Sequence, residues 1–467
     1  MASSKWPQRR IIVLLTFVCT AVCYVERTGF SIAYTAAANS AGITQKSKGN
    51  LLSAFFYGYS ISQVPGGWVA QRIGGRRVLL WSFFAWTLAC IATPIDPRHN
   101  SAVIILIRVL VGVAQGFIIP SVHTVLAQWV PPHERSRSVS LTTSGMYLGA
   151  AFGMLFLPEL VHWSGPRAVY VMEALMGLTW AIFWHFYSTD PPLSEHPKAS
   201  AAGFGAPADI ELKSIHSVKA GEENGLLAAA TKENWKKVGG LEISAAAAAT
   251  AARSRTHIPW KKILQSLPVW AIVVNNYTFH YVLYVLMSWL PTYFDQGLHV
   301  GLQHMGASKT MPYVVMFVMS NVGGLVADYF VTRKIMNVAH TRKWINGVGF
   351  VVAAAGLGIM PKISSVQSAI VCSSVILGSL ALGRAGFAVN HMDIAPRYAG
   401  IVMGISNTAG TFAGIVGVNL TGWILQSSSQ GPADLGSWRL VFGLPAVLCV
   451  FSAAVFCKYA SGDRVFE

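Results

Sequence analysis

The sequence has few charged residues for its length. Only 12% of its 467 residues are Asp, Glu, Lys or Arg, whereas 53% are hydrophobic. Soluble domains carry roughly a quarter charged residues, because their surfaces face water. The scarcity of charge therefore excludes an ordinary soluble protein and predicts a chain solvated mainly by lipid.

Acidic residues and cysteines are scarce as well. The chain has 19 Asp and Glu against 35 Lys and Arg, and its six cysteines all lie in or at the ends of apolar stretches. Cysteines in such places behave as small hydrophobes, so no disulfide framework is expected. No nucleophile–base arrangement or metal-ligand spacing occurs, so we expect neither an enzyme nor a metal or cofactor site. The basic excess has no folded basic domain to carry it, which argues against nucleic acid.

Long apolar runs recur along the whole chain. Crossing hydrocarbon as a helix takes about 20 residues, and each run approaches or exceeds that length. We therefore predict an all-α membrane protein with twelve transmembrane helices. The predicted spans cover residues 11–38, 50–71, 78–95, 102–129, 138–161, 167–188, 268–296, 311–332, 344–361, 366–393, 398–425 and 440–457.

The basic residues between these spans are distributed unequally. Because basic loops remain on the cytosolic side, we predict that both termini and the long central loop are cytosolic. The richer side carries Lys5, Arg9, Arg10, Arg72, Arg76, Arg77, Arg135, Arg137, Arg333, Lys334, Arg342, Lys343, Arg397, Lys458 and Arg464. The poorer side carries Lys46, Lys48, Arg98, Arg167, Lys309, Lys362 and Arg439.

The hydrophobic pattern stops between residues 189 and 259, where Ala, Ser, Gly, Lys and Glu dominate. This composition predicts a cytosolic central loop that is disordered. The loop separates an N-terminal six-helix bundle (1–188) from a C-terminal six-helix bundle (260–467). Two such halves around a central cavity are typical of secondary transporters.

An internal repeat supports this division. The segment Gly67-Trp-Val-Ala-Gln71, followed by Arg76, resembles Gly324-Leu-Val-Ala-Asp328, followed by Arg333, at an offset of 257 residues. Both segments follow the second predicted span of their half, so the pattern indicates duplication.

A second repeated pair begins at Arg135 and at Arg397, 262 residues apart, between the fourth and fifth spans of each half. Charged side chains at such loops can pair in one conformation and separate in another, which predicts a cytosolic gate. The alternative is that they only anchor loops at the lipid headgroups. The predicted gate residues are Gln71, Arg76, Arg135, Asp328, Arg333, Asp393 and Arg397.

Three motifs resemble a known family. They are Asn390-His-Met-Asp393-Ile-Ala-Pro-Arg397-Tyr-Ala, Gln63-Val-Pro-Gly-Gly67 and Trp129-Val-Pro-Pro-His-Glu-Arg-Ser-Arg137. They are similar to the anion:cation symporter branch of the major facilitator superfamily, which includes sialin, vesicular glutamate transporters and plant phosphate transporters. The resemblance implies the major facilitator fold, a small anion as substrate and H+ or Na+ as coupling ion.

Within that branch, three stretches look most like the Golgi-type plant phosphate transporter: Trp270-Ala-Ile-Val-Val-Asn-Asn276, Tyr284-Val-Leu-Met287 and Leu382-Gly-Arg-Ala-Gly-Phe387. The resemblance implies a Golgi membrane location. The first predicted span begins at residue 11, so we expect no cleavable leader or plastid transit peptide. We also expect a monomer.

Three arginines, Arg27, Arg108 and Arg384, fall inside predicted spans. Each costs about 2.5 to 3.5 kcal/mol at the centre of a span on insertion scales, so a compensating partner is required. Guanidinium binds phosphate or carboxylate through paired hydrogen bonds, which predicts an anionic substrate. The alternative is pairing with local acids, namely Glu26, Glu173 or Asp393.

Arg27 matches a family arginine in the first span and is the first candidate ligand, followed by Arg384. Arg108 lies nearer the non-cytosolic end and is predicted to guide anions inward or to bind a regulatory anion. The family's fourth-span acid falls here on Gln115, and a seventh-span arginine of the glutamate carriers falls on Phe279. Both departures weaken the expectation of glutamate as substrate.

Glutamine does not titrate, so proton coupling needs other residues. The candidates are Glu26, Glu173 and His123, which lies about two turns from Gln115. A buried histidine is also common as a purely structural residue. Tyr57 and Tyr59 of the second span are predicted to line the cavity or, alternatively, to pack between helices.

The sequence thus predicts secondary active phosphate symport by alternating access across an endomembrane. Arginines within the spans indicate an anion, whereas phosphate follows from the resemblance alone. The first alternative is a carrier of an organic anion such as sialate, glutamate or ascorbate. An alternative from another class is a non-transporting receptor that senses an anion.

Overall fold

A computed structural model describes residues 7–40, 45–94, 101–190, 258–298, 310–427 and 435–466. These ranges are helical, with no strand among them. Residues up to Thr189 and from Lys262 onward form one compact unit, and Asp190–Lys261 form a second. The predicted central loop falls almost wholly outside the described residues, and the following account concerns the first unit.

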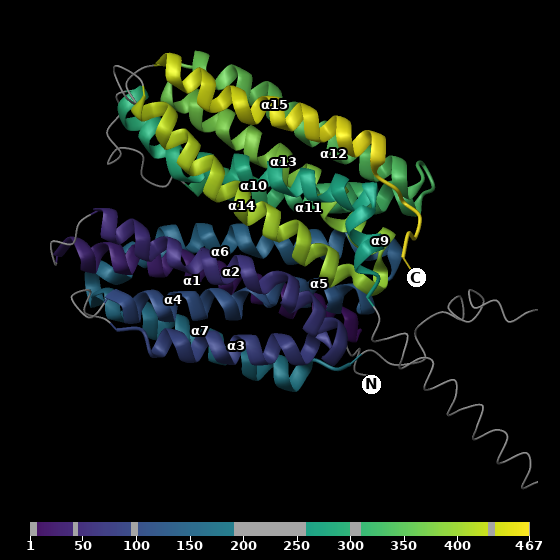
Figure 1. The fold of residues 1–467 in the computed structure, drawn as a ribbon, viewed down its shortest axis with the longest axis horizontal. Helices are drawn as coiled ribbons and strands as arrows, with labels where there is room; N and C mark the ends of the chain where they lie inside the picture. The colour runs from purple at the N-terminus through teal and green to yellow at the C-terminus, as the bar shows by residue number, and fades with distance from the viewer. Residues whose placement is uncertain are drawn as a thin grey trace, which may run out of the picture. The chain divides into compact units, whose positions relative to one another are not determined.

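Figure 1 shows long helices running side by side in each half. The N-terminal half contains α1 (Gln8–Ser40), α2 (Gln45–Ile73), α3 (Gly75–Ile91), α4 (Ser101–Gly116), α5 (Ile118–Trp129), the short η1 (Pro132–Glu134), α6 (Arg135–Ser164) and α7 (Pro166–Tyr187). The C-terminal half contains α9 (Trp260–Gln265), α10 (Leu267–Thr292), η3 (Tyr293–Gly297), α11 (Met311–Thr332), α12 (Val338–Ile359), η5 (Met360–Lys362), α13 (Val366–Ile394), η6 (Pro396–Tyr398), α14 (Ala399–Gln426) and α15 (Leu435–Tyr459).

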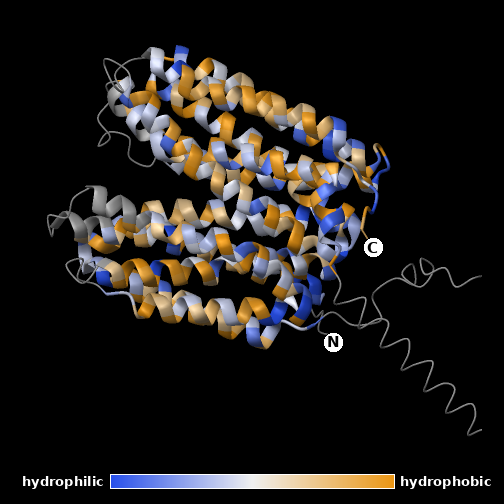
Figure 2. Cartoon of the chain, viewed as in Figure 1, coloured by the Kyte–Doolittle hydropathy of each residue, from blue (hydrophilic) through white to orange (hydrophobic). Residues whose placement is uncertain are grey.

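The predicted all-α membrane fold is confirmed. Ten helical segments in the described ranges are long and apolar enough to span a membrane, with α4 and α5 forming one of them. The helix α3 has only 17 residues and α2 is rich in polar side chains; these two complete two sets of six. Figure 2 shows hydrophobic residues along the helices and hydrophilic residues gathered near one end.

Several boundaries differ from the predicted spans by a few residues, and the start of α12 differs most. Helix α12 begins at Val338, whereas the apolar run predicts a start at residue 344. The Asn337 side chain caps the helix by accepting a hydrogen bond from the His340 backbone N–H at 2.8 Å. An N-cap of this kind satisfies a terminal backbone donor and lets the helix start before its apolar stretch.

The two halves repeat the same close packing of helices. Glycines of α6 face α1, and glycines of α14 face α10, where a Cβ atom would collide with the neighbouring helix. Small residues allow backbones to approach closely in a membrane. The glycines are Gly145, Gly149 and Gly153 on α6 and Gly410, Gly414 and Gly417 on α14.

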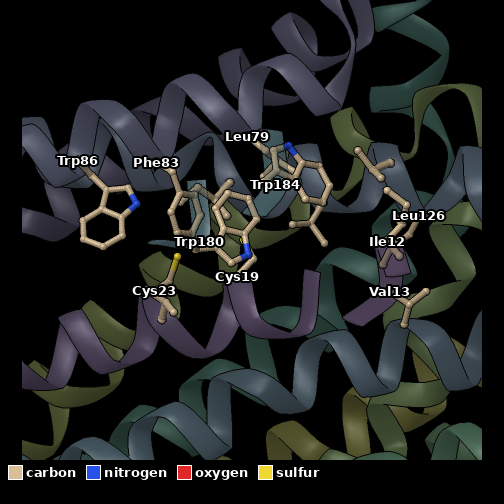
Figure 3. Packing of buried hydrophobic residues seen from close by; sticks show 14 of the residues in the cluster. Ile12, Val13, Cys19, Cys23, Leu79, Phe83, Trp86, Leu126, Trp180 and Trp184 are labelled. Carbon is tan, nitrogen blue, oxygen red and sulfur yellow. The ribbon is translucent and has the colours of Figure 1, made fainter. Parts of the chain in front are cut away.

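An aromatic cluster fixes the outer helices of the N-terminal half. Phe83 and Trp86 of α3 pack beside Trp180 and Trp184 of α7 (Figure 3), and the Phe83 and Trp180 ring centroids are 3.8 Å apart. The Trp180 indole N–H donates to the Leu15 carbonyl of α1 at 2.8 Å. The cluster therefore joins α1, α3 and α7 and holds α1 in place for its polar residues.

Replacing Gly149 with alanine is expected to lower the apparent melting temperature of the purified protein. The added methyl group would meet the Ala21 backbone carbonyl, which cannot rotate away. Overpacking of this kind costs about 1 to 3 kcal/mol. Gly358→Ala is the matched control, because nothing lies near its Cβ position on α12. Equal melting temperatures for the two variants would contradict the proposed close contact.

Candidate functional site

Four polar side chains of α1 and α4 form a connected chain. Arg108 donates to Glu26 Oε1 at 2.6 Å, and the Gln115 amide donates to Glu26 Oε2 at 2.7 Å. The Gln115 carbonyl oxygen in turn accepts a hydrogen bond from Arg27 Nε at 3.2 Å. Glu26 is fully buried, so its charge depends on Arg108 for compensation.

The Arg27 guanidinium lies among aromatic rings. Its Cζ atom is 4.3 Å from the ring centroid of Tyr59, 4.8 Å from that of Tyr24 and 4.9 Å from that of Phe55. Aromatic faces attract a cation without neutralising it. Arg27 therefore keeps its positive charge and its capacity to bind an anion.

Arg384 approaches from α13 of the other half. It is 4% exposed, and its Nη1 donates to the Tyr147 hydroxyl of α6 at 3.0 Å. The Phe279 ring centroid lies 5.0 Å from its guanidinium. Phe279, the position at which the glutamate carriers are expected to have an arginine, thus faces this site with an aromatic ring.

Tyr24 and Tyr284 lie near both arginines. Each tyrosine lies within electrostatic range of both Arg27 and Arg384. Tyr284 also lines a cavity of about 530 Å³ between α2, α10 and α14, together with Tyr57. Tyr57 is thus exposed at the cavity, whereas Tyr59 is buried beneath Arg27.

The three coupling candidates lie in two places. Glu173 of α7 is buried near Glu26 and Cys90, with ligating atoms of the three residues within 4.8 Å of one another. This is the group in the described residues that has the donor atoms to hold a metal ion. His123 lies apart, with its ring centroid 4.7 Å from that of His391 across the two halves.

Charged contacts join the halves at one end, which we call the gate end and define by the loops η1 and η6. Asp393 of α13 accepts from Arg135 at 3.1 Å and from Arg342 at 2.8 Å. Asp328 of α11 accepts from the backbone N–H groups of Ser136 and Arg137 at 3.0 and 2.8 Å. A carboxylate at the exposed donors and positive dipole end of α6 stabilises the contact.

The other predicted gate residues make contacts of other kinds. Arg76 donates to the Ser188 hydroxyl at 2.8 Å and to the His185 carbonyl, both within the N-terminal half. Gln71 belongs to the α2 segment whose Gly67 packs against Gly400 of α14. The guanidinium groups of two further residues lie over neighbouring rings, Arg333 over Tyr329 and Arg397 over Tyr398.

Sequence reasoning did not identify Arg342, Gln63 or Thr411 as residues that join helices through side-chain hydrogen bonds. Arg342 counts as a loop residue in the sequence, but it is 1% exposed and also donates to the Ser136 hydroxyl at 2.6 Å. Gln63 of α2 pairs with Asn407 of α14 and donates to Thr411 at 3.1 Å. Polar residues within apolar runs were the available signal for Gln63 and Thr411, and the cap at Asn337 was the signal for Arg342.

Comparison with known proteins agrees with this architecture. Residues 16–418 match the Major Facilitator Superfamily. The chain belongs to this superfamily. A solved member, the proton:xylose symporter XylE bound to 6-bromo-6-deoxy-D-glucose, superposes with a TM-score of 0.67 over 98% of this chain and 97% of its own, at 14% identity. That likeness shows the fold alone.

Sequence relatives place the chain among the superfamily's plant anion transporters. "Probable anion transporter 5" of Arabidopsis thaliana is 57% identical over the whole of both chains. Two further Arabidopsis thaliana relatives each match 99% of this chain. "Sodium-dependent phosphate transport protein 1, chloroplastic" is 32% identical over 81% of its length, and "Ascorbate transporter, chloroplastic" is 31% identical over 77%. The chain is therefore a membrane transporter related to carriers of different small anions.

Asp393→Asn is expected to open the gate end. Removing one charge of a buried pair costs about 3 to 5 kcal/mol, enough to shift a two-state ratio by at least about a hundredfold. The measurement is the labelling rate of Ser140→Cys, whose position is buried at this end, by a maleimide that does not cross membranes. The same protein with Ser140 retained gives the background from native cysteines.

Asp463→Asn serves as the control, because Asp463 is an exposed acid of the C-terminal tail. Labelling that rises in Asp393→Asn but not in the control supports the gate. An unchanged labelling rate in Asp393→Asn would show that the Asp393 ion pairs do not keep this end closed.

Proposed function

We propose that the protein is a secondary active transporter of inorganic phosphate that binds the anion between Arg27 and Arg384. The observation that carries this proposal is the charge balance at the site. Arg108 has the Glu26 carboxylate as partner, whereas Arg27 bonds neutral Gln115 and Arg384 bonds neutral Tyr147. Two cations within the helical bundle, buried Arg384 and half-buried Arg27, have neutral partners and require an anion for compensation.

The position of these two arginines supports transport of the anion rather than binding alone. Arg27 belongs to α1 of the first half and Arg384 to α13 of the second, so an anion held by both connects the halves. A substrate that binds both halves at their interface couples its own binding to the movement of one half against the other. Hydrogenphosphate, with two negative charges, matches the two guanidinium groups in charge and donor geometry.

The contacts at the gate end support the proposal of alternating access. In this proposal the ion pairs of Asp393 close that end, while the cavity lined by Tyr57 and Tyr284 lies away from it. We place the gate end, both termini and the central loop in the cytosol because of the distribution of basic residues. We place the protein in the Golgi membrane as a monomer, with H+ or Na+ as coupling ion.

An organic anion is the second candidate substrate. The relative named as an ascorbate transporter supports it, just as the relative named as a phosphate transport protein supports phosphate. The aromatic rings around Arg27 offer apolar contact to a larger carboxylate or enediol, including ascorbate, sialate or glutamate. Uptake measurements with these anions separate the candidates.

The test is uptake of labelled phosphate by liposomes that contain the purified protein, under an imposed proton or sodium gradient. We expect saturable uptake that Arg27→Ala abolishes, because the variant removes one of the two cations. Arg10→Ala is the matched control, since Arg10 is exposed on the same helix. Uptake of ascorbate, sialate or glutamate in place of phosphate would reject phosphate as substrate. Phosphate binding without flux of any anion would instead indicate an anion-sensing receptor.

A further inference from the structure

Two buried histidines meet across the interface of the two halves. His123 of α5 is 1% exposed and His391 of α13 is 0% exposed, and their ring centroids lie 4.7 Å apart with the ring planes inclined at 61°. Apolar side chains flank the pair, since Val122 and Leu126 of α5 belong to the same packed cluster as Met392 of α13. The two rings are therefore shielded from water in this conformation.

The ring nitrogens of this pair lack partners. Both ring nitrogens of His391 and Nδ1 of His123 have no hydrogen bond within the described part of the chain. A neutral imidazole carries a proton on one nitrogen and a lone pair on the other, so His391 has an unused N–H donor in either tautomer. A buried donor without an acceptor raises the free energy of the state that contains it. His391 therefore needs an acceptor that the described residues do not supply.

The pair lies between the proposed anion site and the gate end. Arg384 and His391 are seven residues apart on α13, which is two helical turns and about 10 Å along the axis, on the same side of the helix. His391 also lies within electrostatic range of Arg135 at the gate end. An anion that moved along α13 from Arg384 toward the gate end would pass the two rings.

The charges around the pair favour an anion over a cation. Three arginines lie within electrostatic range of His391, namely Arg384, Arg135 and Arg342. Asp393 is the acid of this group, and it already accepts from Arg135 and Arg342. Three guanidinium groups and one carboxylate leave an excess of positive charge. This excess attracts a negative ligand and opposes the binding of a metal ion by the two imidazoles.

We propose that His123 and His391 form a second anion site, which receives the anion from Arg27 and Arg384 when the gate end opens. This proposal rests on the proposed transport function and deepens it by dividing the path to the gate end into two steps. Separation of the halves parts the two rings and admits the anion between them. The N–H group of His391 then donates to a phosphate oxygen.

Contact between the rings makes the second site depend on the gate. While the ion pairs of Asp393 hold the halves together, the rings of His123 and His391 occlude each other. The second site therefore forms only after those ion pairs separate. A neutral imidazole donor holds an anion less tightly than a pair of guanidinium groups, so the second site favours release toward the gate end.

The first test measures two properties of His391→Leu, the turnover number for uptake of labelled phosphate and the melting temperature. Loss of the N–H donor is expected to lower the turnover number about tenfold, as for the loss of one hydrogen bond to a charged group. The melting temperature is expected to rise, because the variant removes an unpartnered polar group from an apolar contact. A purely structural role for His391 would instead move both properties in the same direction.

Two further variants complete this test. His391→Gln keeps an N–H donor and is expected to retain most of the wild-type turnover. His162→Leu, at an exposed histidine of α6, is expected to match the wild type. Wild-type turnover in His391→Leu would overturn the second site and leave the proposed function standing. Absence of phosphate uptake by the wild type would refute the proposed function, and histidine modification would then decide the second site.

Modification by diethyl pyrocarbonate tests anion binding without flux, with peptide mass spectrometry reporting the rate at each histidine. The protein carries Asp393→Asn, which is expected to open the gate end, and Arg27→Ala, which removes the first anion site. We expect inorganic phosphate to slow the modification of His391 several-fold and to leave that of His162 unchanged. If this double variant does not fold, the same rates are measured on the wild-type protein.

Three outcomes of the modification experiment would overturn the proposal. The first is a rate at His391 that phosphate does not change. The second is a rate that Zn2+ slows and phosphate does not, which would assign the pair to a metal ion. The third is a His391 ring that does not react at all, because the second site requires the two rings to become accessible when the gate end opens.

Discussion

The structure depends on how buried positive charge is compensated in a medium that cannot solvate it. Arg108 is compensated within its own half by Glu26, and Arg342 and Arg135 are compensated by Asp393. Arg27 and Arg384 differ, because their side chains bond neutral groups. An arginine that is already paired with an internal carboxylate gains little free energy from binding an anion. An arginine with neutral partners gains more, so the two kinds of arginine differ in their capacity to bind an anionic ligand.

At the gate end, the two repeated segments make contacts of different kinds. In both halves a glycine allows one helix to cross the start of another, Gly67 at α14 and Gly324 at α6. In the second half Asp328 binds the free N–H groups at the start of α6. Gln71 occupies the corresponding place in the first half and brings no charge to the start of α14. The contact between α11 and α6 therefore includes a carboxylate, whereas the equivalent residue of α2 is an uncharged amide.

Much of the fold could be predicted from the sequence, because the length of the apolar runs and the charge of the loops follow directly from the need to cross lipid. The repeat of Gly67 and Gly324 could also be recognised in the sequence, because each glycine is followed four residues later by Gln71 or Asp328. The hydrogen-bond partners of the arginines within the spans could not be predicted from the sequence in the same way. Arg108 and Arg27 are both arginines within spans, and only the packing of α1 on α4 decides that Arg108 bonds Glu26. Arg342 was missed because hydropathy ends a span where the apolar run ends, whereas a helix continues to its cap.

Gln115 connects these observations. Gln115 places an amide, and not a charge, next to Arg27, and the Glu26 carboxylate lies one hydrogen-bonded residue further away. Arg27 is then spared a direct carboxylate partner, which would compete with an anionic substrate for the same donors. Glu26 is fully buried and reaches Arg27 only through Gln115. Separation of the acid from the cation therefore leaves the Arg27 guanidinium without a carboxylate partner among the described residues.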